Sequence, residues 1–283
     1  MNTQSTYGER DKYFQSQYEH VLRNAMVTEK ICDVRHDNVK RIQNPYGNQP
    51  TANIQAVAGT YSVSAWTITD DALTVTDEVI YSEHIYAHEE YFASMDIAQS
   101  RIDELMYAVA FGIDKFALNN LCEDATGSYT TPAGGFATAA NVNEIFANLV
   151  SKVAGYQDTY KGLYVVLENT DMVGLVQAGA TNGFSYADSV LRNGLVDQWM
   201  GVDIYVVRSG TFVDATLGTT TVTNNGHRVF GVKGMATYVS PSGITFEEKT
   251  SDDKTGRQIL VFGLIGFKQW AQKASLTVDI TLA

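Results

Sequence analysis

The sequence predicts an α+β protein, and three features of its 283 residues point to that class. The first is a long amphipathic segment, residues 94–121, which has the periodicity of a helix. The second is strand-like alternation of apolar and polar residues on both sides of that segment. The third is residues 141–207, where helical and strand-like segments alternate as in a compact α/β unit. Together they predict one chain that contains both a long helix and sheets.

The long segment is predicted to be a single helix. Asp96, with Gln99 three residues later, fits a capping box at its start, and Gly127 is a suitable stop. A helix of this length runs about 40 Å, so we expect it to act as a structural spine. Its apolar residues recur mostly at steps of three or four: Met95, Ala98, Ile102, Leu105, Met106, Val109, Ile113, Phe116 and Leu121.

The N-terminal part is predicted to be a helical arm followed by a long hairpin. Residues 9–30 carry a thin apolar helical face, and residues 33–50 are polar and rich in turn formers, as in an extended connection. Residues 53–69 and 73–88 both alternate, which predicts two long strands with a tip around residues 66–71. An isolated hairpin is marginally stable in water, so we expect it to lie on another surface.

The segment after the spine predicts a second helix that begins at Asn141, with Glu144 at the third position. Its apolar face comprises Val142, Ile145, Phe146, Leu149 and Val153. The remaining predicted elements are strands at 161–167, 202–207, 244–249, 258–267 and 276–282, a short helix at 171–177, a loop at 179–183 and a hairpin turn at 251–256.

Composition and charge exclude several classes of protein. The net charge is −12, and the 20 Lys and Arg residues are scattered, so tight binding of nucleic acid is not expected. No apolar run approaches the roughly 20 residues that span a bilayer, and the polar N-terminus does not resemble a signal peptide, so we expect synthesis in a cytosol. Cys32 and Cys122 form no motif, and we interpret both as buried thiols rather than a disulfide or zinc site.

Candidate chemical sites are weak. His84 and His88, flanked by Glu83, Glu89 and Glu90, are the densest ligand-like group, but four residues along a strand span about 13 Å, too far for one metal ion. No acidic pair stands out as an acid and a base, and no nucleophile elbow, P-loop or dinucleotide fingerprint is present. Four tyrosines around the α/β unit could mark a sugar-binding surface, but more often serve as core and interface anchors: Tyr156, Tyr160, Tyr164 and Tyr186. We therefore predict no catalytic, cofactor-binding or metal-binding residues, and no enzyme.

The order of helical arm, hairpin, spine, α/β unit and strand-rich tail resembles the major capsid protein of tailed bacteriophages, which has the Hong Kong 97-type fold. The resemblance covers nearly the whole chain, and the joint order of the motifs carries it. The matching local patterns are Glu83–Ala87 before Met95–Gln99, Ala110–Asp114, Tyr160–Leu167, Gly194, Met200–Ser209, Gly226–Val232 and Leu264–Trp270.

The resemblance implies a division into four parts. These are an N-terminal arm (1–52), an extended hairpin loop (53–84), a peripheral domain with the spine helix (85–140 and 215–270) and an axial domain (141–214 and 271–283). It also implies that the hairpin drapes over a neighbouring subunit and that the arm reaches across another. The residues expected at these inter-subunit contacts are Phe14, Tyr18, Leu22, Trp66, Ile68, Leu73 and Val75.

The function that the resemblance implies is a structural shell subunit. Hexamers and pentamers would close into an icosahedral shell around the double-stranded DNA of a tailed phage, without sequence-specific DNA binding. Because the chain starts almost directly with the arm, we expect a separate scaffolding protein, and a portal as a further partner; the product would be a virion component made in the host bacterial cytoplasm. Two alternatives stay open: an encapsulin-like compartment of the same fold, and an unrelated enzyme or carbohydrate-binding domain.

Overall fold

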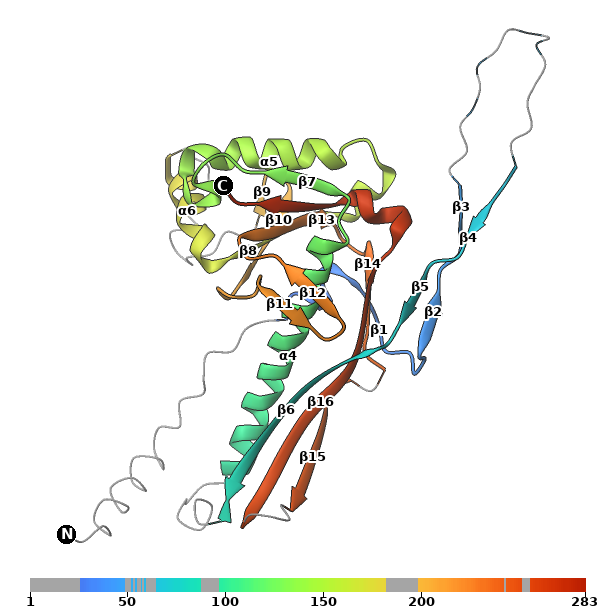
Figure 1. The fold of residues 1–283 in the computed structure, drawn as a ribbon. Helices are drawn as coiled ribbons and strands as arrows, with labels where there is room; N and C mark the ends of the chain where they lie inside the picture. The colour runs from blue at the N-terminus through green and yellow to red at the C-terminus, as the bar shows by residue number, and fades with distance from the viewer. Residues whose placement is uncertain are drawn as a thin grey trace.

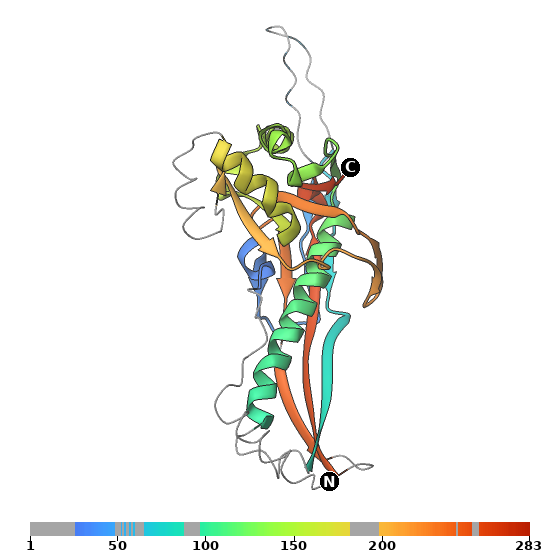
Figure 2. The same ribbon diagram turned by 90° about the vertical axis from the view of Figure 1, so that its left-hand side faces the viewer.

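The structure is a computed structural model that describes residues 26–48, 65–87, 97–181, 198–241, 243–250 and 255–283, with single residues between 52 and 59. In these residues a long helix runs beside a narrow sheet and ends in a wider α/β body (Figure 1, Figure 2). The helices are α2 (Thr28–Ile31), α4 (Ile97–Glu123), α5 (Ala139–Val153) and α6 (Met172–Thr181). Short 3₁₀ turns lie at Gly135–Ala137 (η1), Gln157–Lys161 (η2), Asn169–Asp171 (η3) and Ala271–Leu276 (η4).

The narrow sheet has five strands, in the order β1-β14-β16-β15 with β6 also paired to β16. Their bounds are β1 Asp33–Arg35, β6 Asp77–Tyr86, β14 Ala236–Val239, β15 Thr245–Thr250 and β16 Gly256–Gln269. Helix α4 covers one face of this sheet (Figure 2). The core between them contains Leu105, Val109, Ile113 and Phe116 from α4, and Ile85, Ile259, Val261 and Ile265 from the strands. The helical period of α4 and the two-residue period of the strands thus bury their apolar faces against each other.

The wider sheet has six strands in the order β7-β17-β13-β8-β10-β9. Their bounds are β7 Gly127–Thr130, β8 Leu163–Glu168, β9 Gln198–Trp199, β10 Val202–Val207, β13 His227–Val232 and β17 Thr277–Thr281. Every apolar residue predicted for the face of α5 is fully buried in the core of this body. The predicted strands at 161–167 and 202–207 form the parallel pair β8 and β10, so the α/β unit is confirmed. A separate hairpin, β11 (Asp214–Leu217) and β12 (Thr220–Thr223), was not predicted.

The projecting loop is paired differently from the prediction. Strand β2 (Arg41–Gln43) pairs with β5 (Ala72–Thr74), and β3 (Tyr46–Gly47) pairs with β4 (Ile68–Thr69). We call these four strands the loop stem, and in Figure 1 the stem extends away from both sheets. The predicted tip at residues 66–71 is therefore wrong: these residues enter the stem, and β6 pairs with β16 instead. Alternation identifies a half-exposed strand but does not specify its partner.

Helix boundaries differ from the predictions in three places. Helix α4 ends at Glu123, and Gly127, predicted as its stop, opens strand β7 instead. Helix α5 begins before Asn141, whose side-chain amide donates to the carbonyl of Ala133 at 3.0 Å and does not cap the helix. Helix α6 continues to Thr181, through Gly179, which was predicted to lie in a loop. The proposed start of the spine at Asp96, like the apolar residues Phe14, Tyr18 and Leu22, falls outside the described residues.

The region predicted as an extended connection, residues 33–50, contributes strands to the folded body. Strand β1 lies parallel to β14, and β2 and β3 form one side of the loop stem.

Both cysteines are free; Cys122 is buried and Cys32 half-buried, and burial raises the pKa of both thiols above their ordinary value. None of the helices in the described residues is both long and apolar enough to cross a membrane.

Candidate assembly surfaces

The N-terminal segment is fastened to the spine at Asp114. This carboxylate is 3% exposed and accepts hydrogen bonds from the backbone N–H groups of Val27 and Thr28, and from the Thr28 hydroxyl at 2.7 Å. Val27 and Ile31 are buried in the same cluster as Leu118 of α4. A buried carboxylate with several donors is an effective anchor because those donors replace the water that it has lost. Helix α4 therefore holds residues 27–31 in a fixed position.

A pH-dependent stability is expected from this anchor. Burial raises the pKa of the Asp114 carboxyl above its ordinary value of 3.8, although hydrogen bonds from Thr28 and Val27 act in the opposite direction. A carboxyl with a raised folded-state pKa contributes stability that is present at acid pH and is lost as the pH rises through that pKa. We expect the stability advantage of the wild type over Asp114→Asn to be larger at pH 4 than at pH 7, measured by urea unfolding.

The companion variant for that experiment is Thr28→Val, which removes only the hydroxyl donor at 2.7 Å. It is expected to lower the free energy of unfolding by about 1 kcal/mol. An advantage of wild type over Asp114→Asn that grows toward pH 7 would contradict the prediction, since it would mean that the hydrogen bonds outweigh burial.

The loop stem carries exposed apolar side chains at its outer end. Trp66 is 73% exposed and Ile68 is 59% exposed. The indole of Trp66 lies over Gly47 of the opposite strand so closely that a Cβ on Gly47 would come within 2.4 Å of its Nε1. Because Gly47 has no side chain, the Trp66 ring packs directly on its backbone, while most of the ring remains exposed to solvent. Large apolar groups held in this way are typical of surfaces that contact another molecule.

The root of the stem is packed inside its own chain. Leu73 is 1% exposed and forms a cluster with Val239 and Trp270, against which the half-buried Val75 also packs. The expectation that Leu73 contacts a neighbouring subunit is therefore corrected: its side chain is used to fasten the stem to the narrow sheet. The alternating pattern could not distinguish an outer position from a root position, because both are apolar residues in a strand.

A second exposed apolar surface lies on the face of the narrow sheet that α4 does not cover. Ile80 and Leu264 are exposed on β6 and β16, whereas their neighbours Val79 and Ile265 pack toward α4. In the strand register Ile80 lies opposite Phe262, which is half-buried. We call Ile80, Phe262 and Leu264 the outer strip. Within the described chain its apolar side chains are only partly covered.

Among the described residues no group of three or more His, Cys, Asp or Glu side chains could hold a metal ion. The ring of His84 packs edge-on against Tyr86 with their centroids 4.7 Å apart, and His88 lies outside the described residues. Tyr164 is buried, and burial raises the pKa of its hydroxyl, whereas Tyr160 is largely exposed. These two tyrosines therefore do not share one surface.

The sequence reasoning missed a buried ionic cluster that joins β13 to the end of β8, to η3 and to the turn after β10. Arg228 of β13 is 4% exposed; its Nη2 donates to Glu168 at 3.0 Å and its Nε donates to Asp171. Glu168 also accepts from the backbone N–H groups of Gly210 and Thr211 at 2.9 and 3.2 Å. The guanidinium lies over the Phe212 ring. Because all of these charged groups are satisfied and enclosed, the cluster holds the turn after β10 in place and is closed to a substrate.

The described residues form a spine helix along a narrow sheet, a six-stranded α/β body and a projecting loop stem. No protein-family model matches the sequence, and no curated protein matches it. Solved structures match along nearly the full length. A chain of Mycobacterium phage Che8 has a TM-score of 0.74 and 17% identity, over 93% of each chain.

Two further matches are chains of capsids. The chain from the mature capsid of bacteriophage PhiM1 has a TM-score of 0.69 and 12% identity, covering 95% of this chain and 90% of that one. The chain from the capsid of an empty GTA particle has a TM-score of 0.68 and 14% identity, covering 95% and 93%. The protein thus has the fold of phage capsid chains, as the resemblance in sequence predicted.

Proposed function

We propose that this protein is a major capsid protein of the Hong Kong 97 type, a structural subunit without enzymatic activity. The observation that carries the proposal is the match to capsid chains at TM-scores of 0.69 and 0.68, each over 95% of this sequence. Subunits would assemble through hexamers and pentamers into an icosahedral shell that encloses double-stranded DNA, as a virion component built in the bacterial cytoplasm. A scaffolding protein and a portal are the further partners proposed.

The four-part division is retained with revised boundaries. Strands β7 and β13 both pair with β17 in the six-stranded sheet, which supports assigning them to the axial part, although both fall within the ranges first given to the peripheral domain. Strand β1 pairs with β14 and β6 pairs with β16, which supports placing both in the peripheral sheet. The extended loop then begins at β2 and returns through β5. The N-terminal arm then comprises the residues before Val27, the first residue that Asp114 binds.

The contacts proposed between subunits follow from the exposed apolar surfaces. Trp66 and Ile68 on the loop stem would pack on the outer strip of a neighbour, which offers apolar side chains of matching character. Val75, half-buried at the root of the stem, would lie at the border of this contact, and Phe14, Tyr18 and Leu22 of the arm would contact another neighbour. DNA would be enclosed without sequence-specific binding, because a net charge of −12 disfavours tight contact with phosphates.

Electron microscopy and light scattering of the purified protein, with and without a co-expressed scaffolding partner, test the proposal. Closed shells, or hexamers and pentamers, are expected for the wild type. The double variant Trp66→Ser/Ile68→Ser is expected to leave the melting temperature nearly unchanged, because both side chains are largely exposed, and to abolish assembly.

A matched control for that variant is Tyr160→Ser, which removes an exposed aromatic residue from η2, away from the stem. It is expected to assemble like the wild type. A wild-type protein that stays a 31.1 kDa monomer with the scaffolding partner present would overturn the proposed function.

A further inference from the structure

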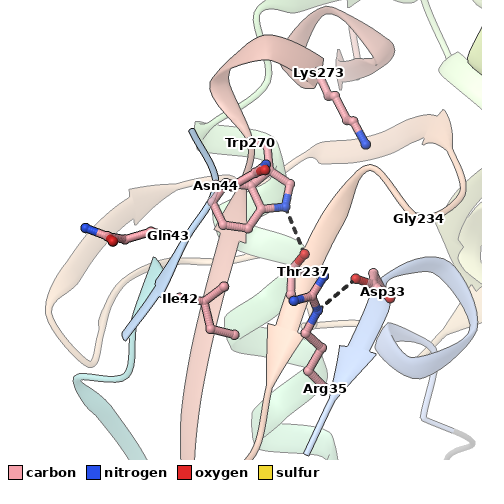
Figure 3. A pocket seen from close by; sticks show the side chains of 9 residues that line it. All are labelled: Asp33, Arg35, Ile42, Gln43, Asn44, Gly234, Thr237, Trp270 and Lys273. Atoms are coloured by element: carbon pink, nitrogen blue, oxygen red, sulfur yellow. Dashed lines mark hydrogen bonds and ion pairs between the residues drawn. The ribbon is translucent and has the colours of Figure 1, made fainter. Parts of the chain in front are cut away.

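A small polar pocket lies where the loop stem joins the body. It is enclosed by β1, the start of the stem, the turn before β14 and η4, so it joins segments that are far apart in the sequence (Figure 3). Its volume is about 160 Å³. The residues around it are Asp33, Arg35, Ile42, Gln43, Asn44, Gly234, Thr237, Trp270 and Lys273.

The pocket contains more positive than negative charge. Asp33 is its single acidic side chain, and it accepts from Nε of Arg35 at 3.2 Å. This leaves the two terminal nitrogens of the guanidinium available. Lys273 reaches toward the pocket from the opposite side (Figure 3), and its ammonium has no carboxylate partner within the described part of the chain. The side chain of Arg35 is 45% exposed and Lys273 is half-buried, so both cations can be reached from solvent, and their remaining donors favour an anion.

The size of the pocket limits what that anion can be. A volume of about 160 Å³ lies below the 300–1,000 Å³ of ordinary ligand sites. A nucleotide is too large for this space. One carboxylate side chain, or one small inorganic anion, is of the right size.

The remaining donors favour a carboxylate over a phosphate. Phosphate sites usually present several backbone N–H groups, but here the N–H of Gly234 donates to Ile31 and that of Asn44 donates to Asp71. The side-chain amide of Gln43 donates to Asp70. Two cationic groups remain, which match the two oxygens of a carboxylate. Ile42 and Trp270 provide an apolar wall for the methylene groups of an acidic side chain.

We infer that this pocket receives an Asp or Glu side chain from a second copy of the chain. The charge of the molecule supports that source: 32 acidic residues face 20 basic ones, so an identical neighbour brings a surplus of carboxylates to any shared contact. The location supports it too, because a neighbour that packs along the loop stem must pass its root. The inference rests on the proposed function and specifies the ionic contact that accompanies the apolar one.

Charge reversal at Lys273 tests the inference. Lys273→Glu is expected to raise the protein concentration needed for assembly about tenfold, as expected for the loss of a charge-assisted hydrogen bond. Lys273→Arg is expected to assemble normally. The matched control is Lys152→Glu, which makes the same charge change at an exposed position of α5. Light scattering and electron microscopy give the assembly threshold, and a thermal melt of each variant confirms folding.

The source of the carboxylate is identified by second-site reversal. In the Lys273→Glu background, each acidic residue is changed to Lys in turn, and at least one such change is expected to restore assembly. No restoring position, or a Lys273→Glu protein that assembles like the wild type, would overturn the inference while the proposed function stands. Binding of inorganic phosphate to the unassembled wild type, lost in Lys273→Glu, would instead assign a free anion and would also overturn it. Failure of the wild type itself to assemble would count against the proposed function.

Discussion

Replacing Arg228 by methionine is expected to lower the free energy of unfolding by about 3–5 kcal/mol. The side chain is buried between Glu168 and Asp171, and methionine fills similar space without a charge. Two carboxylates would then face each other away from water with no cation between them. Their mutual repulsion and lost solvation are the source of the predicted destabilisation. Urea unfolding, followed by circular dichroism, measures it.

The matched control is Arg257→Met on strand β16. Arg257 contacts Glu248 at 2.9 Å, but the two side chains are 41% and 38% exposed, so the expected cost is about 0–1 kcal/mol. Adding Glu168→Gln and Asp171→Asn to the Arg228 variant is expected to recover part of the loss, because the uncompensated charges are removed. An Arg228→Met protein as stable as Arg257→Met would show that the cluster contributes nothing beyond a surface pair.

Replacing Gly174 by alanine is expected to destabilise the protein by about 1–3 kcal/mol, against the usual preference of a helix for alanine. Gly174 lies in α6 where the helix crosses η1. A Cβ at this position would meet the carbonyl oxygen of Phe136 at 2.1 Å and the carbonyl carbon of Ala137 at 2.5 Å. Both atoms belong to the backbone, so no side-chain rotation can relieve the clash. The melting temperature should fall accordingly.

Gly179→Ala in the same helix is the control for this prediction. There a Cβ meets only the Trp199 ring, at 3.7 Å, which is ordinary van der Waals contact. Alanine is expected to stabilise the protein by about 0.5–1 kcal/mol, since it restricts the unfolded chain and favours the helix. The prediction would be contradicted if Gly174→Ala stabilised the protein as much as Gly179→Ala does. Such a result would mean that α6 can move away from η1 without cost.

The elements that the sequence predicts well are those with one dominant periodic face. The spine was recognised because its apolar stripe continues over many turns, and α5 because its inward positions are all large and apolar. Strand β8 was recognised as a short apolar run between polar segments. In each case the local pattern and the tertiary environment agree.

The features that the sequence did not reveal depend on contacts between distant segments. Residues 53–69 and 73–88 were predicted to form one hairpin, but β4 and β5 pair with residues 46–47 and 41–43, a choice that is decided by the whole fold. The burial of Leu73 follows from Trp270, which is nearly 200 positions away. The same holds for the cluster around Arg228 and for the pocket at Lys273, whose charged groups converge only after folding. Glu168 and Asp171, directly after an apolar run, were the one local sign of the cluster.

The interior position of β17, next to the edge strand β7, has a consequence for the order in which the protein can be made. This strand pairs with β7 on one side and with β13 on the other, although β7 precedes it by more than half of the chain. During synthesis on the ribosome β7 therefore has no strand to pair with until β17, the last strand of the sheet, has been made. Such non-local closure slows folding and leaves an unpaired edge exposed during translation. It also means that the six-stranded body cannot be completed before its last strand has been synthesised.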